Sequence, residues 1–90
     1  MATPVFTRPF LEEVARADKR VRDEVWEKAE LVAPFPGVGS ALVPEALQTA
    51  LGQDCLKVAV FSLELIYRRV VRQDDELVVF LALIPQRRVR

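Results

Sequence analysis

Apolar residues recur with two different periods along the chain, about 3.6 residues in the first third and two in the second half. Val21, Val25, Ala29 and Val32 follow one another at spacings of four, four and three, which is typical of one face of a helix. Asp18 stands directly before this pattern, where its side chain can accept a hydrogen bond from a free backbone amide. The sequence therefore predicts a helix that begins after Asp18.

A shorter helix is expected before Asp18. Thr7 can cap it, Pro9 lies in its first turn, and Phe10, Val14 and Ala17 share one face. Because little more than Asp18 separates the two patterns, the two helices are predicted to form an antiparallel hairpin.

Prolines mark both ends of this hairpin. Pro4 to Thr7 is predicted to form a short edge strand, because a residue before proline avoids the α region and Val5 and Phe6 favour strands. Residues 34 and 36 are prolines that end the second helix. Residues 35–54 carry turn signals and are interpreted as a long connecting loop, either a binding element or a segment with a short helix starting near Pro44.

Three strand-like runs follow, Cys55 to Phe61, Leu63 to Val71 and Leu77 to Ile84, and their short connections predict an antiparallel meander. In the second run Leu63, Leu65 and Tyr67 point to one face, and Glu64, Ile66 and Arg68 point to the other, wetter one. The third run is apolar on both faces, which indicates a central strand. The predicted fold is α+β: an N-terminal short strand and an α-helical hairpin packed on an antiparallel three- to four-stranded sheet, in one domain over residues 1–90.

Length and composition narrow the classes of protein that fit. Ninety residues, 51% of them hydrophobic, suit one folded domain. The longest uncharged apolar run is Leu77 to Ile84, far short of the roughly 20 residues that span a bilayer. No apolar stretch resembling a signal peptide opens the chain, so a cytoplasmic protein without a membrane partner is expected. With one cysteine, Cys55, and no histidine, we expect no disulfide, no metal site and no cofactor.

Charge is distributed unevenly although it sums to zero. Residues 1–45 carry 6 basic and 8 acidic side chains, or −2, while residues 46–90 carry 7 and 5, or +2. Three of the positive charges fall in the last five residues, Gln86 to Arg90, where the favoured interpretation is a solvated tail.

The order of short strand, helix hairpin, loop, three-strand meander and basic end resembles that of the RelE/ParE superfamily, small bacterial toxins encoded beside a neutralising antitoxin. The stretches that carry the resemblance are Asp54-Cys55-Leu56-Lys57-Val58, Leu65-Ile66-Tyr67-Arg68, Leu77-Val78-Val79-Phe80-Leu81 and Gln86-Arg87-Arg88. The resemblance covers nearly the whole chain.

Members that resemble RelE cut messenger RNA in the ribosomal decoding site, with cations around the phosphate on an exposed face of the sheet. The resemblance therefore implies the toxin of a type II toxin–antitoxin system that inhibits translation by ribosome-dependent mRNA cleavage. Lys57 and Arg87 match catalytic positions, and Arg68, Arg69 and Arg88 are candidate RNA-binding residues. The implied partners are the cognate antitoxin and the ribosome with its mRNA.

Three departures from the family pattern weigh against cleavage. Glu64 stands where these nucleases usually have an arginine, Ala59 replaces a second lysine, and the terminal tyrosine or histidine is missing. Two alternatives follow: a ParE-like toxin that binds DNA gyrase, or a non-toxic relative whose partner is the antitoxin alone. In all three cases the helix hairpin and the sheet are expected to offer an apolar groove to an antitoxin helix.

Each candidate residue also has a structural interpretation. Lys57 can be a solubilising strand residue, and Glu64 can be a general base or the ion-pair partner of Lys57. The arginines at the end of the second run can pair across the turn with its acidic residues instead of contacting phosphate. Tyr67, Trp26 and Cys55 are interpreted as core residues, with a hydrogen-bond partner for the Tyr67 hydroxyl.

Overall fold

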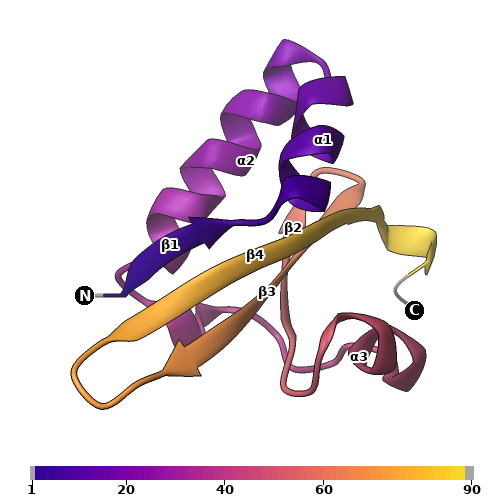
Figure 1. Cartoon of the computed structure of the whole chain (residues 1–90). Coiled ribbons are helices and arrows are strands. Elements are labelled where there is room, and N and C mark those ends of the chain that lie inside the picture. The colour runs from indigo at the N-terminus through magenta and orange to yellow at the C-terminus, as the bar shows by residue number, and fades with distance from the viewer. Residues whose placement is uncertain (1, 89–90) are drawn as a thin grey trace.

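The computed structural model describes residues 2–88, which form an α+β domain, as the sequence predicts (Figure 1). The elements are β1 (Thr3–Phe6), α1 (Arg8–Arg16), α2 (Lys19–Val32), the 3-10 turn η1 (Pro36–Val38), α3 (Glu45–Leu51), β2 (Leu56–Val60), β3 (Leu63–Val71), β4 (Glu76–Pro85) and the 3-10 turn η2 (Gln86–Arg88). Within this described part, no helix combines the length and the apolar character needed to cross a membrane.

The four strands form one sheet in the order β1-β4-β3-β2. The meander β2-β3-β4 is antiparallel and β4 is central, both as predicted. β1 adds to the free edge of β4 in parallel, with Thr3 opposite Leu77 and Phe6 opposite Phe80. The sheet is therefore mixed and not wholly antiparallel as expected, because the helix hairpin returns the chain to the sheet before the meander begins.

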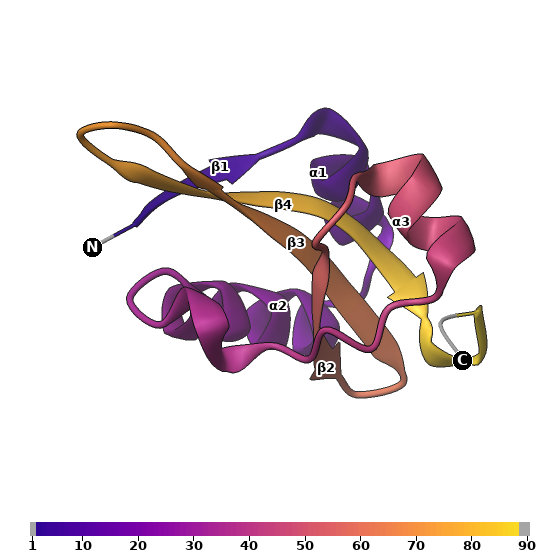
Figure 2. The same ribbon diagram turned by 90° about the horizontal axis from the view of Figure 1, so that it is seen from below.

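The helix hairpin covers one face of the sheet (Figures 1 and 2). The main core lies between these layers and contains Phe10 and Val14 of α1, Val25, Ala29 and Val32 of α2, and Val60, Leu65, Tyr67, Val78, Phe80 and Leu83 of the strands, together with Ala2. Each large apolar side chain buried in this way contributes about 1.5–3 kcal/mol. The predicted helical stripes are thus the faces that pack on the sheet.

The two predicted helix caps have different outcomes. Asp18 caps α2 as predicted, and its carboxylate accepts the Val21 amide at 3.0 Å. Thr7 occupies the N-cap position of α1 but makes no capping bond. Its hydroxyl instead donates to the Phe80 carbonyl at 2.8 Å, so this side chain joins the start of α1 to β4.

The opposite face of the sheet is covered by α3 and its flanking segments, which lie away from α1 and α2 (Figure 1). A second, smaller core forms there from Val43, Cys55 and Ile66, with Leu47, Leu51, Leu81, Ala82 and Ile84 packed against it. Ile66, expected on the wetter face, is fully buried. The long loop of the sequence interpretation therefore contains a short helix, the second of the two possibilities left open.

A bulge in β4 supplies part of this second core. Ile66 is opposite Ala82 and Tyr67 is opposite Phe80, so Leu81 has no partner on β3. The extra residue turns two consecutive side chains, Leu81 and Ala82, toward the same apolar cluster. Val78, Phe80 and Leu83 of the same strand belong to the main core, so β4 contributes to both cores.

Candidate functional site

Lys57 and Arg68 lie on the same face of the β2-β3 pair, the face that α3 partly covers. Lys57 is opposite Ile66, which places Arg68 and Glu64 at the two diagonal positions, at Cα separations of about 7–8 Å. All three side chains are half-buried. Among residues 2–88, no carboxylate forms an ion pair with Lys57, so Glu64 does not neutralise it.

The Arg68 side chain lies across the end of α3. A Cβ atom built on Gly52, the residue after α3, would be 2.8 Å from Arg68 Cδ and 2.9 Å from its Nε. The Gly52 φ of 118° favours glycine, and a larger residue here would also have to displace the Arg68 side chain. The Arg68 Nε is buried and has no acceptor among residues 2–88. Because Gly52 directly follows α3, the Arg68 guanidinium lies beside the C-terminal end of this helix, where positive charge is favoured.

Cys55 is buried beneath the same arginine. Its Sγ donates to the Gly52 carbonyl at 2.7 Å. Burial raises the pKa of the Cys55 thiol, and the positive charge of Arg68 offsets this only in part. The thiol is therefore neutral near pH 7 and is a poor nucleophile, in line with its interpretation as a core residue.

Arg69 faces the opposite side of the sheet from Lys57 and Arg68. Its guanidinium forms two hydrogen bonds with Glu76, at 3.2 and 3.3 Å, and lies beside Gly37 of η1. At the neighbouring turn Arg72 pairs with Asp75 at 2.6 Å. Two of the three arginines at the end of β3 therefore pair across the turn, and the structure does not bring Arg69 together with the other candidate RNA-binding residues.

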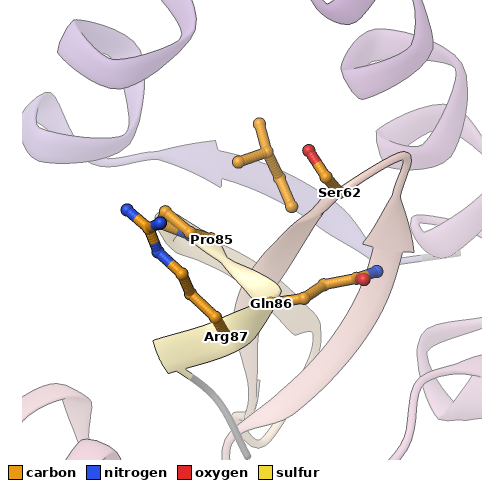
Figure 3. Close-up of a pocket in the computed structure, with 5 residues that line it drawn as sticks. Ser62, Pro85, Gln86 and Arg87 are labelled. Atoms are coloured by element: carbon orange, nitrogen blue, oxygen red, sulfur yellow. The ribbon is translucent and has the colours of Figure 1, made fainter.

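Arg87 lies at the far end of the meander, in a cleft of about 420 Å³ between the β2-β3 turn and η2 (Figure 3). Gln86 ties η2 to this turn, because its amide N–H donates to the Ser62 carbonyl and its Nε2 donates to the Phe61 carbonyl, each at 2.9 Å. In Figure 3 the side chains of Gln86 and Arg87 extend in different directions from η2. Arg87 and Arg88 are both exposed.

The two predicted catalytic residues do not share one pocket. Leu63, which lines the Arg87 cleft, pairs with Val60 at the end of β2. Lys57 lies three residues before Val60, a separation of about 10 Å along the strand. A single phosphate does not span that distance, whereas an RNA strand of two or more nucleotides does.

Tyr67 is a structural anchor and does not line the cleft beside Arg87. It is fully buried, its hydroxyl donates to the Pro36 carbonyl at 2.7 Å, and it accepts the Gly39 amide at 2.9 Å. Burial raises the pKa of this tyrosine. It is the only tyrosine in a chain without histidine, so neither residue type supplies an accessible acid or base.

Comparison with models of known protein families, with curated proteins and with solved structures found no significant match.

An apolar groove of about 470 Å³ lies between β1 and α2. Trp26 forms part of its wall with 36% of its surface exposed, so its interpretation as a core residue is wrong. The indole packs edge-on against Phe6, with ring centroids 5.2 Å apart. The sequence held one signal for this position, since Trp26 flanks the buried stripe of α2 and does not belong to it.

Proposed function

We propose that the protein is a toxin of the RelE/ParE type that binds and cleaves messenger RNA on the ribosome and is neutralised by a protein antitoxin. The first support is the order of its elements. A strand and two helices precede the antiparallel meander, and the basic residues of η2 follow it, which is the arrangement that the sequence resemblance implies.

The observation that carries the proposal is the pairing of the basic residues. Six lysines and arginines form ion pairs with carboxylates, namely Arg8, Arg16, Lys19, Lys28, Arg69 and Arg72. Four of the five candidate site residues are not among them: Lys57, Arg68, Arg87 and Arg88 have no ion-pair partner within residues 2–88. Cations without a carboxylate partner are available for phosphate, and two of them, Lys57 and Arg68, lie on the same face of the sheet.

The proposed reaction uses the cations as charge stabilisers. The 2′-oxygen bonds to phosphorus while the bond from phosphorus to the 5′-oxygen breaks, and Lys57 balances the charge that develops on the phosphoryl oxygens. Arg87 binds the phosphate of a neighbouring nucleotide and holds the RNA strand in place. Glu64, on the same face as Lys57, accepts the 2′-hydroxyl proton. Water supplies a proton to the leaving 5′-oxygen, since no histidine and no accessible tyrosine is present.

A second candidate function is inhibition of DNA gyrase by binding, as for toxins that resemble ParE. The observation that favours it is the environment of Tyr67, whose buried hydroxyl forms hydrogen bonds with the backbone of Pro36 and Gly39. A binding toxin needs no acid–base residue, so the absence of an accessible one is no obstacle to this role.

Induced expression in bacteria distinguishes the two candidates. Pulse-labelling of protein and of DNA synthesis after induction is expected to show an early arrest of translation with DNA synthesis continuing. Early arrest of DNA synthesis together with DNA-damage signalling would support the gyrase candidate instead. Unchanged growth and labelling at verified protein levels would contradict both.

A further inference from the structure

The segment that covers the Lys57 face of the sheet packs on it through few side chains. It consists of residues 41–54, with α3 in the middle. To the second core it contributes the buried Val43 and the partly buried Leu47 and Leu51. Within residues 2–88 the main core contains twelve buried residues and the second core contains three. Detachment of this segment therefore exposes much less apolar surface than detachment of the helix hairpin would.

Hydrogen bonds hold the segment together but do not attach it to the sheet. Within residues 2–88, all hydrogen bonds of residues 41–51 stay inside residues 40–52. One of them joins the side chain of Gln48 to the backbone of Val43, where Nε2 donates to the carbonyl at 2.8 Å. Residues 41–51 can therefore leave the sheet without breaking a hydrogen bond to a strand.

The two ends of the segment are suited to act as hinges. At the first end Ser40 is fixed to β2 by two backbone hydrogen bonds with Lys57, each 2.9 Å long. At the second end Gly52 and Asp54 both have positive φ, 118° and 63°. Positive φ is less favourable for aspartate than for glycine, so the closed position of the segment carries a small backbone cost at this end. Changes in backbone angle between these ends leave the sheet itself intact.

The closed segment shields two polar groups from solvent. Cys55 retains only 2% of its exposure. The Arg68 Nε is buried and has no acceptor within residues 2–88, and its side chain lies against Gly52 at the end of the segment. A buried N–H without an acceptor costs free energy, and opening of the segment removes this cost by admitting water or an anion to the guanidinium.

We propose that residues 41–54 form a lid that opens as a unit while the helix hairpin and the sheet stay folded, and that opening gives the phosphate of RNA access to Arg68. The opening itself follows from the packing of the segment. The identity of the anion rests on the proposed function, since a nuclease binds the phosphates of its substrate. RNA that binds the open state better than the closed state shifts the equilibrium toward opening.

Cys55 is the only cysteine of the chain and reports opening directly, because the lid packs over it. The measurement is the rate at which the thiol reagent DTNB labels Cys55 in the native protein, divided by the rate in the unfolded protein at the same pH. This ratio gives the fraction of molecules in which the thiol is exposed. We expect it to exceed the globally unfolded fraction from urea denaturation by at least about 100-fold, and to depend more weakly on urea because a short segment exposes less surface.

Two truncations of apolar side chains distinguish opening of the lid from global unfolding. Leu51→Ala weakens the closed lid and should raise the labelling rate at least about ten-fold. Val14→Ala is the matched control, because Val14 lies in the main core, which the open state retains. It should lower global stability and leave the labelling rate of Cys55 unchanged. Acceleration by both variants, or an exposed fraction equal to the globally unfolded fraction, would overturn the lid.

A uridine RNA of about ten nucleotides tests what the open lid admits. It should accelerate the labelling of Cys55 with saturation, and Arg68→Ala should abolish this acceleration. Arg16→Ala removes an exposed cation that is ion-paired with Glu13 and should leave the acceleration unchanged. RNA that slows labelling or does not affect it would overturn the access of phosphate to Arg68. None of these readouts depends on toxicity or cleavage, so failure of this inference is distinguishable from failure of the proposed function, which growth and pulse-labelling test.

Discussion

The Tyr67 hydroxyl accepts the amide hydrogen of Gly39 at 2.9 Å and thereby joins the middle of β3 to the segment after α2. The same hydroxyl donates to the Pro36 carbonyl at 2.7 Å, so both ends of η1 are held by one buried side chain. Tyr67→Phe keeps the ring but leaves these two backbone groups without their partner. We expect a loss of about 1–3 kcal/mol in the free energy of unfolding, measured by urea denaturation.

Hydrogen exchange provides the specific control for this prediction. The Gly39 amide should exchange faster in Tyr67→Phe, while amides of α1 should change only by the global loss of stability. Unchanged protection at Gly39 would contradict the anchoring role.

Gly37, within η1, and Gly39, just after it, should respond differently to alanine. A Cβ on Gly39 would lie 2.6 Å from the Tyr67 hydroxyl oxygen and 3.0 Å from the Lys57 carbonyl, so Gly39→Ala must displace one of them. A Cβ on Gly37 would approach nothing closer than the Arg69 guanidinium at 3.9 Å. Thermal denaturation should show a clear fall in Tm for Gly39→Ala and little change for Gly37→Ala. Equal effects of the two substitutions would argue against the close approach.

Stability should decrease at alkaline pH. Burial raises the pKa of both Cys55 and Tyr67 in the folded state, so the unfolded chain ionises first and gains from rising pH. These two groups therefore leave the free energy of unfolding unchanged below about pH 8.5, the ordinary pKa of a thiol. The free energy of unfolding falls as the pH rises past that value, and it falls further past the ordinary tyrosine pKa of about 10. Denaturation at a series of pH values measures this decline in the free energy of unfolding. Cys55→Ala should remove the part of the decline that begins near the thiol pKa. A decline of the same shape in that variant would contradict the assignment.

Gly52→Ala tests the contact between Arg68 and the end of α3. The Gly52 φ of 118° is costly for alanine, and the new Cβ would overlap Arg68 Cδ at 2.8 Å, so a loss of about 2 kcal/mol is expected. Arg68→Ala removes the overlap but not the backbone strain. In a double-mutant cycle the loss from Gly52→Ala should therefore be smaller when Arg68 is absent, and an identical loss would indicate that the two residues do not interact.

Much of the fold could be predicted from side-chain periodicity. The α2 stripe, the Asp18 cap and the alternation along β3 each depend on local spacing, and all three are present in the structure. α3 is harder to detect because it has only seven residues, its N-cap residue Pro44 provides no side-chain cap, and none of its residues is fully buried. Its apolar residues Leu47 and Leu51 define a single turn, which is too short to show a period.

The features that shape the candidate site depend on contacts between distant segments. A run that is apolar on both faces fits several registers equally well, so the bulge at Leu81 leaves no mark in the sequence. Alternation along β3 places Arg68 and Arg69 on opposite faces, although the sequence interpretation grouped both as candidate RNA-binding residues, and the pairing of Arg69 with Glu76 depends on the hairpin. The exposure of Trp26 depends on where β1 joins the sheet, which residue spacing does not reveal.

The proposed role of the cations is tested most directly by mapping the 3′ ends of messenger RNA in a purified bacterial translation system. The wild-type protein is expected to produce cleavage products only when ribosomes are present, and Lys57→Ala with Arg87→Ala should reduce them by at least about ten-fold, a barrier increase of about 1.4 kcal/mol. The control pair is Arg16→Ala with Lys19→Ala, two exposed cations that are already ion-paired, and it should cleave like the wild type. Undiminished cleavage by the Lys57 and Arg87 double variant, or no cleavage by the wild type, would contradict the account.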